Sequence, residues 1–199
     1  MDEIAFHCEP PSNIPTMVVA FGGWVDAGEA ATGALRYLVG QLAAAPLATI
    51  DPEEFVDFTT IRPVVRLSAE GQRRIRWPRS AFWTWQPPAG RAGLLLFRGV
   101  EPQRRWRAYA TLLLDVAARC GVQRIVSLGA VLAAVPHTRP PHVTGNSTDP
   151  AVIFRSGLHQ PRCLSALLKS SCRRFSRCEI DSHASPSASL FFKACGCFV

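Results

Sequence analysis

The stretch Thr16-Met17-Val18-Val19-Ala20-Phe21-Gly22-Gly23-Trp24-Val25-Asp26-Ala27-Gly28-Glu29 decides how the rest of the chain is interpreted. Its first six residues are a short apolar run rich in β-branched side chains, which predicts a buried strand. Gly22-Gly23 predicts a turn. Asp26 and Glu29 have the spacing of an acidic capping box, in which Asp26 accepts hydrogen bonds from the first helix amides while Glu29 reaches back. The pattern predicts strand, tight turn and helix.

This alternation of strand and helix continues along the chain. Apolar residues at four-residue spacing predict that the first helix ends near Ala44. The remaining predicted elements are a strand at 48–50, a hairpin of strands at 63–67 and 73–77, a strand at 93–97, a helix at 103–119 and a strand at 122–128. This order predicts an α/β domain with a mainly parallel sheet.

Composition fits one domain and excludes several classes of function. The chain has 199 residues, of which 48% are hydrophobic and 19% charged, enough for one α/β domain. The net charge is +7, but residues 151–199 carry seven Lys or Arg against Glu179 and Asp181, and so supply +5 of it. Because the body is nearly neutral, we predict no nucleic-acid binding. No signal peptide and no run of roughly 18 apolar residues occurs, so we predict no membrane association and a cytoplasmic location.

The composition changes at about residue 150. Residues 151–199 hold nine Ser, against five before them, and five of the seven Cys, whereas all five Trp lie earlier. Neither strand alternation nor a long helical stripe is evident there. We therefore expect an α/β domain at 1–150 and a poorly ordered Ser/Arg/Cys-rich tail at 151–199. The cysteine spacings miss those of common zinc sites, and we predict no metal and no cofactor.

Polar side chains follow two of the predicted strands, 16–21 and 122–128. Because parallel strands end at a common edge, we expect these side chains to form one rim. The candidate residues are Gly22, Gly23, Trp24, Asp26, His137, Thr138, Arg139, Thr144 and Gly145. Two uses stay open: a ligand or partner loop, or a catalytic group of Asp26, His137 and Arg139. Against phosphate binding, the turn has no Lys and Asp26 already fills the helix start with negative charge.

The predicted hairpin and the aromatic segment after it are a second candidate surface. Large aromatics flanked by Pro and Arg are enriched at protein interfaces. A hydrophobic minicore under the hairpin is the competing interpretation. For the hairpin arginines we expect surface ion pairs with the acidic residues nearby in sequence, Glu53, Glu54, Asp57 and Glu70. The candidate interface residues are Arg62, Trp77, Trp83 and Trp85.

Several ordered blocks of the sequence resemble the proteasome assembly chaperone 2 family, in its bacterial branch. Two of them are Val18-Val19-Ala20-Phe21-Gly22-Gly23-Trp24-Val25-Asp26-Ala27-Gly28 and Val135-Pro136-His137-Thr138-Arg139-Pro140. The others lie at 50–55, 60–63, 77–78, 99–102 with 105–106, 128–130, 143–145 and 149–150. The resemblance is lost within about ten residues after residue 150, so we expect a sheet that is incomplete at the C-terminus and hypothesise a frameshifted or truncated gene product.

The resemblance implies a three-layer α/β/α fold similar to that of nucleoside phosphorylases. In archaeal and eukaryotic members it implies binding of proteasome subunits during assembly, often as an oligomer, whereas the role of bacterial members is not established. Our first interpretation is a non-enzymatic domain that binds proteins, with proteasome subunits and further copies of the chain as candidate partners. The alternative is a nucleoside-, nucleotide- or phosphate-binding enzyme. An ATP-grasp enzyme, which some family labels name, lacks support because no basic and acidic nucleotide site is visible.

Overall fold

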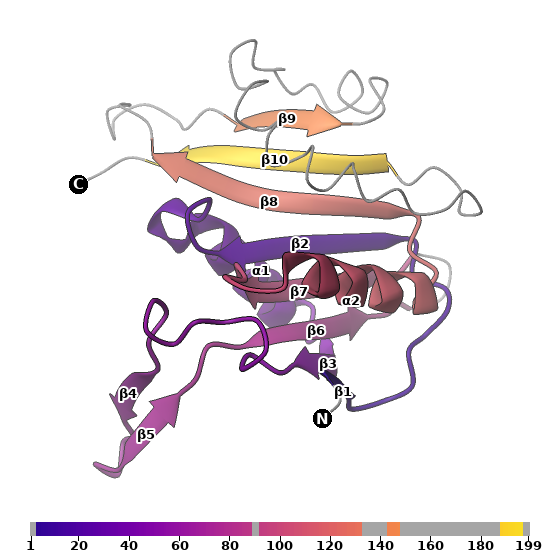
Figure 1. Cartoon of the computed structure of the whole chain (residues 1–199). Helices are drawn as coiled ribbons and strands as arrows, with labels where there is room; N and C mark the ends of the chain where they lie inside the picture. The colour runs from indigo at the N-terminus through magenta and orange to yellow at the C-terminus, as the bar shows by residue number, and fades with distance from the viewer. Residues whose placement is uncertain (1–2, 89–91, 133–142, 148–187, 197–199) are drawn as a thin grey trace.

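The computed structural model describes residues 3–88, 92–132, 143–147 and 188–196. Within them the strands are β1 (Ile4–Phe6), β2 (Thr16–Gly22), β3 (Ala45–Ile50), β4 (Val64–Leu67), β5 (Arg73–Arg76), β6 (Ser80–Trp85), β7 (Leu94–Val100), β8 (Arg124–Leu132), β9 (Val143–Ser147) and β10 (Ala188–Gly196). The helices are α1 (Ala30–Gln41) and α2 (Trp106–Arg119), with a 3-10 turn, η1 (Ala27–Glu29), before α1. Eight strands form one sheet in the order β1-β3-β6-β7-β2-β8-β10-β9, and β4 pairs with β5 in a separate sheet (Figure 1).

The large sheet is parallel at its centre and antiparallel at its flanks. β2 pairs in parallel with β7 and β8, and β8 pairs in parallel with β10. The four other pairs, β1 with β3, β3 with β6, β6 with β7 and β9 with β10, are antiparallel. The predicted α/β class is therefore confirmed, but the sheet is mixed rather than mainly parallel. The sequence interpretation left β6 unassigned, and this strand joins β7 through a short connection that permits only an antiparallel neighbour.

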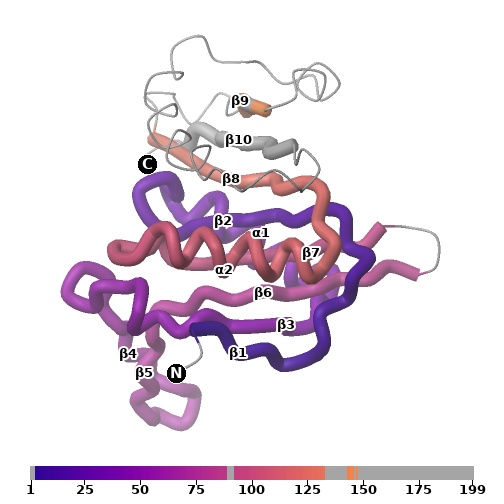
Figure 2. Tube along the Cα trace, turned by 45° about the vertical axis from the view of Figure 1, so that its right-hand side comes forward, coloured from indigo at the N-terminus to yellow at the C-terminus, as the bar shows by residue number. Residues whose placement is uncertain are grey.

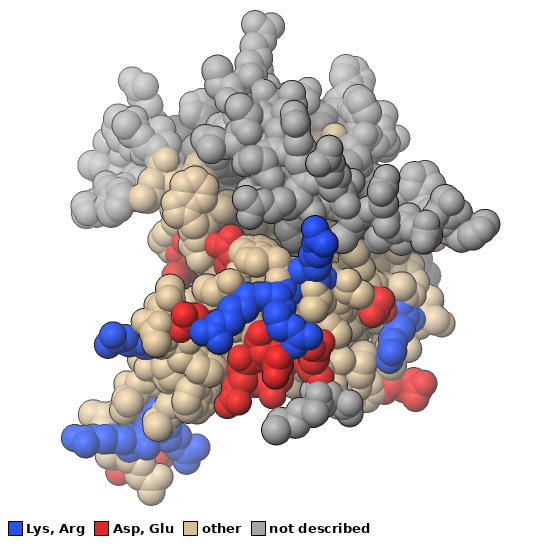
Figure 3. Space-filling view, viewed as in Figure 1, with Lys and Arg blue, Asp and Glu red and all other residues tan. Residues whose placement is uncertain are grey.

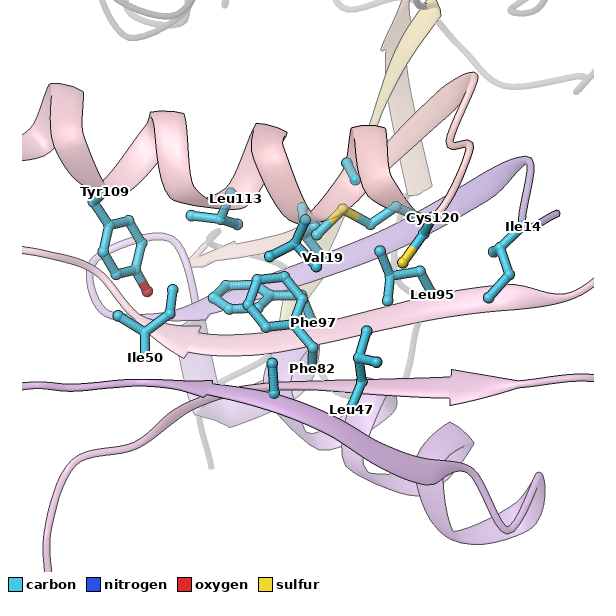
Figure 4. Packing of buried hydrophobic residues seen from close by; sticks show 14 of the residues in the cluster. Ile14, Val19, Leu47, Ile50, Phe82, Leu95, Phe97, Tyr109, Leu113 and Cys120 are labelled. Atoms are coloured by element: carbon cyan, nitrogen blue, oxygen red, sulfur yellow. The ribbon is translucent and has the colours of Figure 1, made fainter. Parts of the chain in front are cut away.

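The two helices cover opposite faces of this sheet (Figures 1 and 2). Side chains alternate along each strand, so Val19 and Phe97 belong to the core cluster that includes α2, whereas Ala20 and Leu96 belong to the cluster with α1. On the α2 side, the ring centroids of Phe82 and Phe97 lie 4.5 Å apart (Figure 4). The expected three-layer α/β/α arrangement is confirmed.

On the α1 side, the helix covers only part of the sheet. There α1 packs mainly against β2, β7 and β8. The antiparallel flank of β6, β3 and β1 lies beyond β7 in the sheet order, outside the strands that α1 covers. As a result, part of this flank on the α1 side faces the separate hairpin instead of a helix.

The predicted hairpin is present as β4 and β5, and it projects from the body at the lower left of Figure 1. Its turn uses Gly71, whose positive φ of 74° suits glycine, and the amide of Ser68 donates to the carbonyl of Gln72 at 2.8 Å. Every residue of both strands is exposed. Since a lone two-stranded hairpin is marginally stable in water, this arm depends on its attachment or on a partner for order.

The C-terminal part of the sequence is only partly described. Residues 188–196 form β10, which lies between β8 and β9. Residues 148–187 and 197–199 lie outside the described residues. The domain boundary near 150, the poorly ordered tail and the frameshift stay predictions. Among the described helices, none has the length and apolar character needed to cross a membrane.

Candidate functional site

The loop after β2 lies against the end of β8, as parallel strands with a common edge require. The amide of Ala130 donates to the carbonyl of Val25 at 2.8 Å, and Asp26 forms a parallel bridge with Ala130. Gly22, Gly23, Trp24 and Asp26 therefore sit where β2 and β8 both end.

Asp26 serves as the cap of α1. Its side chain is buried, with Oδ1 accepting hydrogen bonds from the amides of Ala31 (2.8 Å) and Thr32 (3.2 Å), while Oδ2 accepts from the Thr32 hydroxyl. These contacts satisfy amides at the helix start that have no partner within the helix. The hydrogen bonds described for this carboxylate go to residues of α1 and give it a structural role, while the catalytic alternative for Asp26 stays a prediction.

The other half of the predicted capping box is wrong. Glu29 does not reach back, because the 3-10 turn shifts the start of the helix to Ala30 and puts Glu29 in the left-handed region with φ 54°. Its carboxylate lies 3.9 Å from the Arg36 guanidinium instead, and both side chains are exposed. An exposed pair at this distance contributes little to stability.

The turn at Gly22-Gly23 is filled by a carboxylate of the protein itself. The amide of Trp24 donates to Oε2 of Glu101 at 3.3 Å, and a Cβ at Gly23 would lie 2.6 Å from that same oxygen. A phosphate at this turn would need the amides that Asp26 and Glu101 already hold. The geometry therefore gives no support to the phosphate-binding alternative, and Trp24 is left 80% exposed beside the turn.

The second half of the predicted rim is only partly described. His137, Thr138 and Arg139 lie outside the described residues, so their approach to Asp26 stays a prediction. Thr144 and Gly145 belong to β9 and not to the loop expected there. Because β10 separates β9 from β8, the structure places these two residues roughly two strand spacings, or about 10 Å, from the β8 backbone.

The hairpin has two faces of different character. Paired residues on antiparallel strands share a face, so the register of β4 with β5 puts Val65, Leu67, Arg73 and Ile75 on one side and Val64, Arg66, Arg74 and Arg76 on the other. We call the first the apolar face and the second the basic face. On the apolar face Val65, Leu67 and Ile75 are 57%, 70% and 60% exposed. The predicted minicore does not form beneath it; only Trp77, at the base, packs its ring edge-on against Phe58 with centroids 5.1 Å apart.

The predicted ion pairs of the hairpin arginines are also wrong. The neighbouring acids are held elsewhere: Arg105 donates to Glu54 at 2.6 Å, and Arg104 lies 3.6 Å from Asp57. Glu70 hydrogen-bonds Ser68, which lowers the pKa of its carboxyl group. Figure 3 shows the result, with the blue side chains of the hairpin at the lower left, apart from the mixed red and blue group on the body. In the described part of the chain, no carboxylate lies within ion-pair distance of a hairpin arginine.

A groove of about 810 Å³ lies between the hairpin and the antiparallel flank of the sheet, and we call it the hairpin groove. Three of the four interface candidates, Arg62, Trp77 and Trp83, line it. The fourth, Trp85, is half-buried near the far end of β6 and is not among the lining residues. The arginines that line the groove are Arg62, Arg66, Arg76, Arg79 and Arg98.

Arg98 is the lining residue that sequence reasoning missed. It lies on β7, and its guanidinium is 5.7 Å from the centre of the Trp83 ring. Burial lowers the pKa of Arg98, and the positive charges of Arg36, Arg76 and Arg79 lower it further. A signal existed in the sequence, because a basic residue inside the otherwise apolar strand 93–100 is unusual for a buried position.

The buried polar groups described in the core have structural roles. Tyr109 donates or accepts a hydrogen bond with the Ser80 hydroxyl at 2.8 Å, and burial raises the pKa of its phenol well above the usual range. Burial also raises the pKa of the Cys120 thiol to about 11, which disfavours the reactive thiolate. Among the described residues, no three His, Cys, Asp or Glu side chains group as metal ligands would.

Comparison with known proteins gives a consistent assignment. The sequence model of the PAC2 family matches residues 20–174. No curated protein matches the sequence. Among solved structures, a proteasome-assembly chaperone homologue of Mycobacterium tuberculosis is 33% identical, with a TM-score of 0.71 over 91% of this chain and 75% of that one.

Two further structures extend the comparison. A PAC2 family protein of Streptomyces avermitilis is also 33% identical, with a TM-score of 0.70 over 91% of this chain and 76% of its own. PbaA of Pyrococcus furiosus, an archaeal homolog of proteasome-assembly chaperone, shares the fold at 11% identity, with a TM-score of 0.59 over 97% of this chain and 76% of that one. On the family match and the two 33% identical structures, this chain belongs to the PAC2 family.

Proposed function

We propose that this chain is a non-enzymatic, chaperone-like domain that binds protein partners in the cytoplasm, with proteasome subunits as the partner class. The observation that carries the proposal is the apolar face of the hairpin, where Val65 and Leu67 are more than half exposed on an arm that projects from the body. Contiguous exposed apolar surface of this kind marks protein interaction sites. The names of the archaeal and mycobacterial relatives support the same class of partner.

The apolar face is suited to a partner that buries it. Burying a Leu or Val side chain contributes about 1.5–3 kcal/mol. A few such anchors at the centre of an interface supply most of its binding energy. The hairpin also has unpaired strand edges, which a partner strand can extend.

The test mixes the purified chain with purified proteasome subunits of its own organism and measures complex formation by size-exclusion chromatography with light scattering. We expect co-elution, and we expect the Val65→Ser/Leu67→Ser variant to weaken the complex at least about tenfold, or 1.4 kcal/mol. Tyr37→Ser is the matched control, because Tyr37 is similarly exposed but lies on α1. It should leave the complex unchanged.

Two results would count against the proposal. Absence of any complex, together with thermal stabilisation by a nucleoside or by inorganic phosphate, would favour the enzyme alternative. A multiple of the chain mass in light scattering, with no subunit bound, would show that the apolar face joins copies of this chain and does not hold a proteasome subunit.

A further inference from the structure

The hairpin groove is a basic channel with an apolar lining. Its floor is the α1-side surface of the antiparallel flank, including Trp83, and one wall is the hairpin with Val64 on its basic face. Ile75 of the apolar face also reaches the groove. Its volume of about 810 Å³ leaves room for a peptide segment of several residues and lies in the upper part of the range of small-molecule sites.

Within the described residues its arginines have no ion-pair partner, and Glu29 offsets the repulsion on Arg98 only in part. Five arginines line the groove, whereas Asp51 is the one carboxylate among the lining residues and accepts a hydrogen bond from the amide of Glu53. None of the described ion pairs involves a lining arginine. The arginines instead act on one another, since Arg76 and Arg79 both contribute to the lowered pKa of Arg98. An anionic occupant would relieve this repulsion.

We propose that the hairpin groove binds an extended acidic segment of a protein partner, with carboxylates against the arginines and aliphatic side chains against Val64 and Ile75. This inference rests on the proposed function, which it deepens by naming the chemistry of the bound segment. Arginine suits the role because its planar guanidinium holds a carboxylate through two parallel hydrogen bonds.

The lining favours a peptide over a nucleic acid. Nucleic-acid grooves of this size stack bases on open aromatic rings. Here one face of the Trp83 ring lies against the Arg98 guanidinium, and Trp77, although 55% exposed, is the one other tryptophan of the lining and packs edge-on against Phe58. The remaining apolar lining includes aliphatic side chains such as Val64 and Ile75. Such side chains pack well against the side chains of a peptide and give a base no ring to stack on.

The test measures fluorescence anisotropy of a labelled nonapeptide of alternating Glu and Leu, using the full chain. A peptide with Lys in place of Glu and a twelve-nucleotide oligo-dT are the comparison probes. We expect the acidic peptide to bind, more weakly as salt rises, and the other two to bind at least tenfold more weakly. Tighter binding of oligo-dT would overturn the proposal in favour of a nucleic-acid groove, and no binding of the acidic peptide would overturn it outright.

Two substitutions on the same strand separate the groove from general charge attraction. Arg76→Glu and Arg73→Glu make the same change of charge on exposed residues of β5, but only Arg76 lines the groove. We expect Arg76→Glu to weaken peptide binding at least tenfold and Arg73→Glu less than twofold, with both variants checked for an unchanged circular dichroism spectrum. Equal losses would contradict the proposal.

Failure of the groove proposal can be told apart from failure of the proposed function. If the peptide does not bind but the chain still co-elutes with proteasome subunits, only the groove assignment fails. If the peptide binds with the expected pattern of variants but no subunit complex forms, the groove takes acidic segments and the partner class is wrong.

Discussion

The loop after β2 and the hairpin β4–β5 both present an exposed tryptophan beside charged side chains, yet their charges differ in what they contact. At the loop, Glu101, which follows β7, accepts a hydrogen bond from an amide of the turn, and Asp26 accepts from the amides of the helix start. In the hairpin, the arginines lie near each other with no described carboxylate within reach. Charges that hold the fold together are partnered internally, whereas charges left without a partner are available to another molecule.

The loop should therefore matter for stability. Replacing Asp26 by Ala removes the acceptor for three hydrogen bonds at the start of α1, and we expect a loss of about 2 kcal/mol in the free energy of unfolding, measured by urea denaturation. Asp26→Asn keeps one acceptor oxygen and should lose less. A change below about 0.5 kcal/mol in Asp26→Ala would show that the carboxylate is not structural, and would favour the catalytic alternative.

The core offers an intermediate case, a polar group that is both buried and partnered. Burial raises the pKa of Tyr109 above its ordinary 10.0, so its contribution to stability is complete below pH 10 and is lost as pH rises through the higher value of the folded state. We expect the free energy of unfolding to fall by under about 1 kcal/mol between pH 9.5 and 10.5 through this group. Tyr109→Phe should remove this fall in the free energy of unfolding with pH, while any fall that comes from Cys120 persists. If the free energy of unfolding falls equally with pH in the variant and in the unchanged chain, the pH dependence does not come from Tyr109.

The hairpin should matter least for stability. Exposed residues without internal partners change the free energy of unfolding by no more than about 0.5 kcal/mol when substituted. We expect Val65→Ser/Leu67→Ser and Arg76→Glu to stay within that limit in urea denaturation, even as they weaken partner and peptide binding. A loss above 1 kcal/mol in either variant would mean that the hairpin packs on the body, and the contrast with the loop would disappear.

The elements with strong local patterns were predicted correctly. The strand 16–21, the hairpin and the helix at 103–119 correspond to β2, β4–β5 and α2, with α2 starting three residues later at Trp106. β6 was missed because its aromatic residues were interpreted as a surface cluster, and this omission also hid the antiparallel flank. The capping role of Asp26 was predicted, since its partners lie five and six residues away.

The sequence by itself determined the α/β order of elements, the strand–turn–helix unit at 16–44 and the presence of the hairpin, because each depends on periodicity or contacts within a few residues. Only the tertiary structure decided which charges pair. Glu54 lies close to the hairpin in sequence, but folding brings it to Arg105, 51 residues away, and Asp57 likewise faces Arg104. The amides of Gln103 and Arg104 donate to the carbonyl of Phe55 and hold these two segments together. The unpaired state of the hairpin arginines and the groove they line therefore follow from long-range geometry that no local pattern encodes.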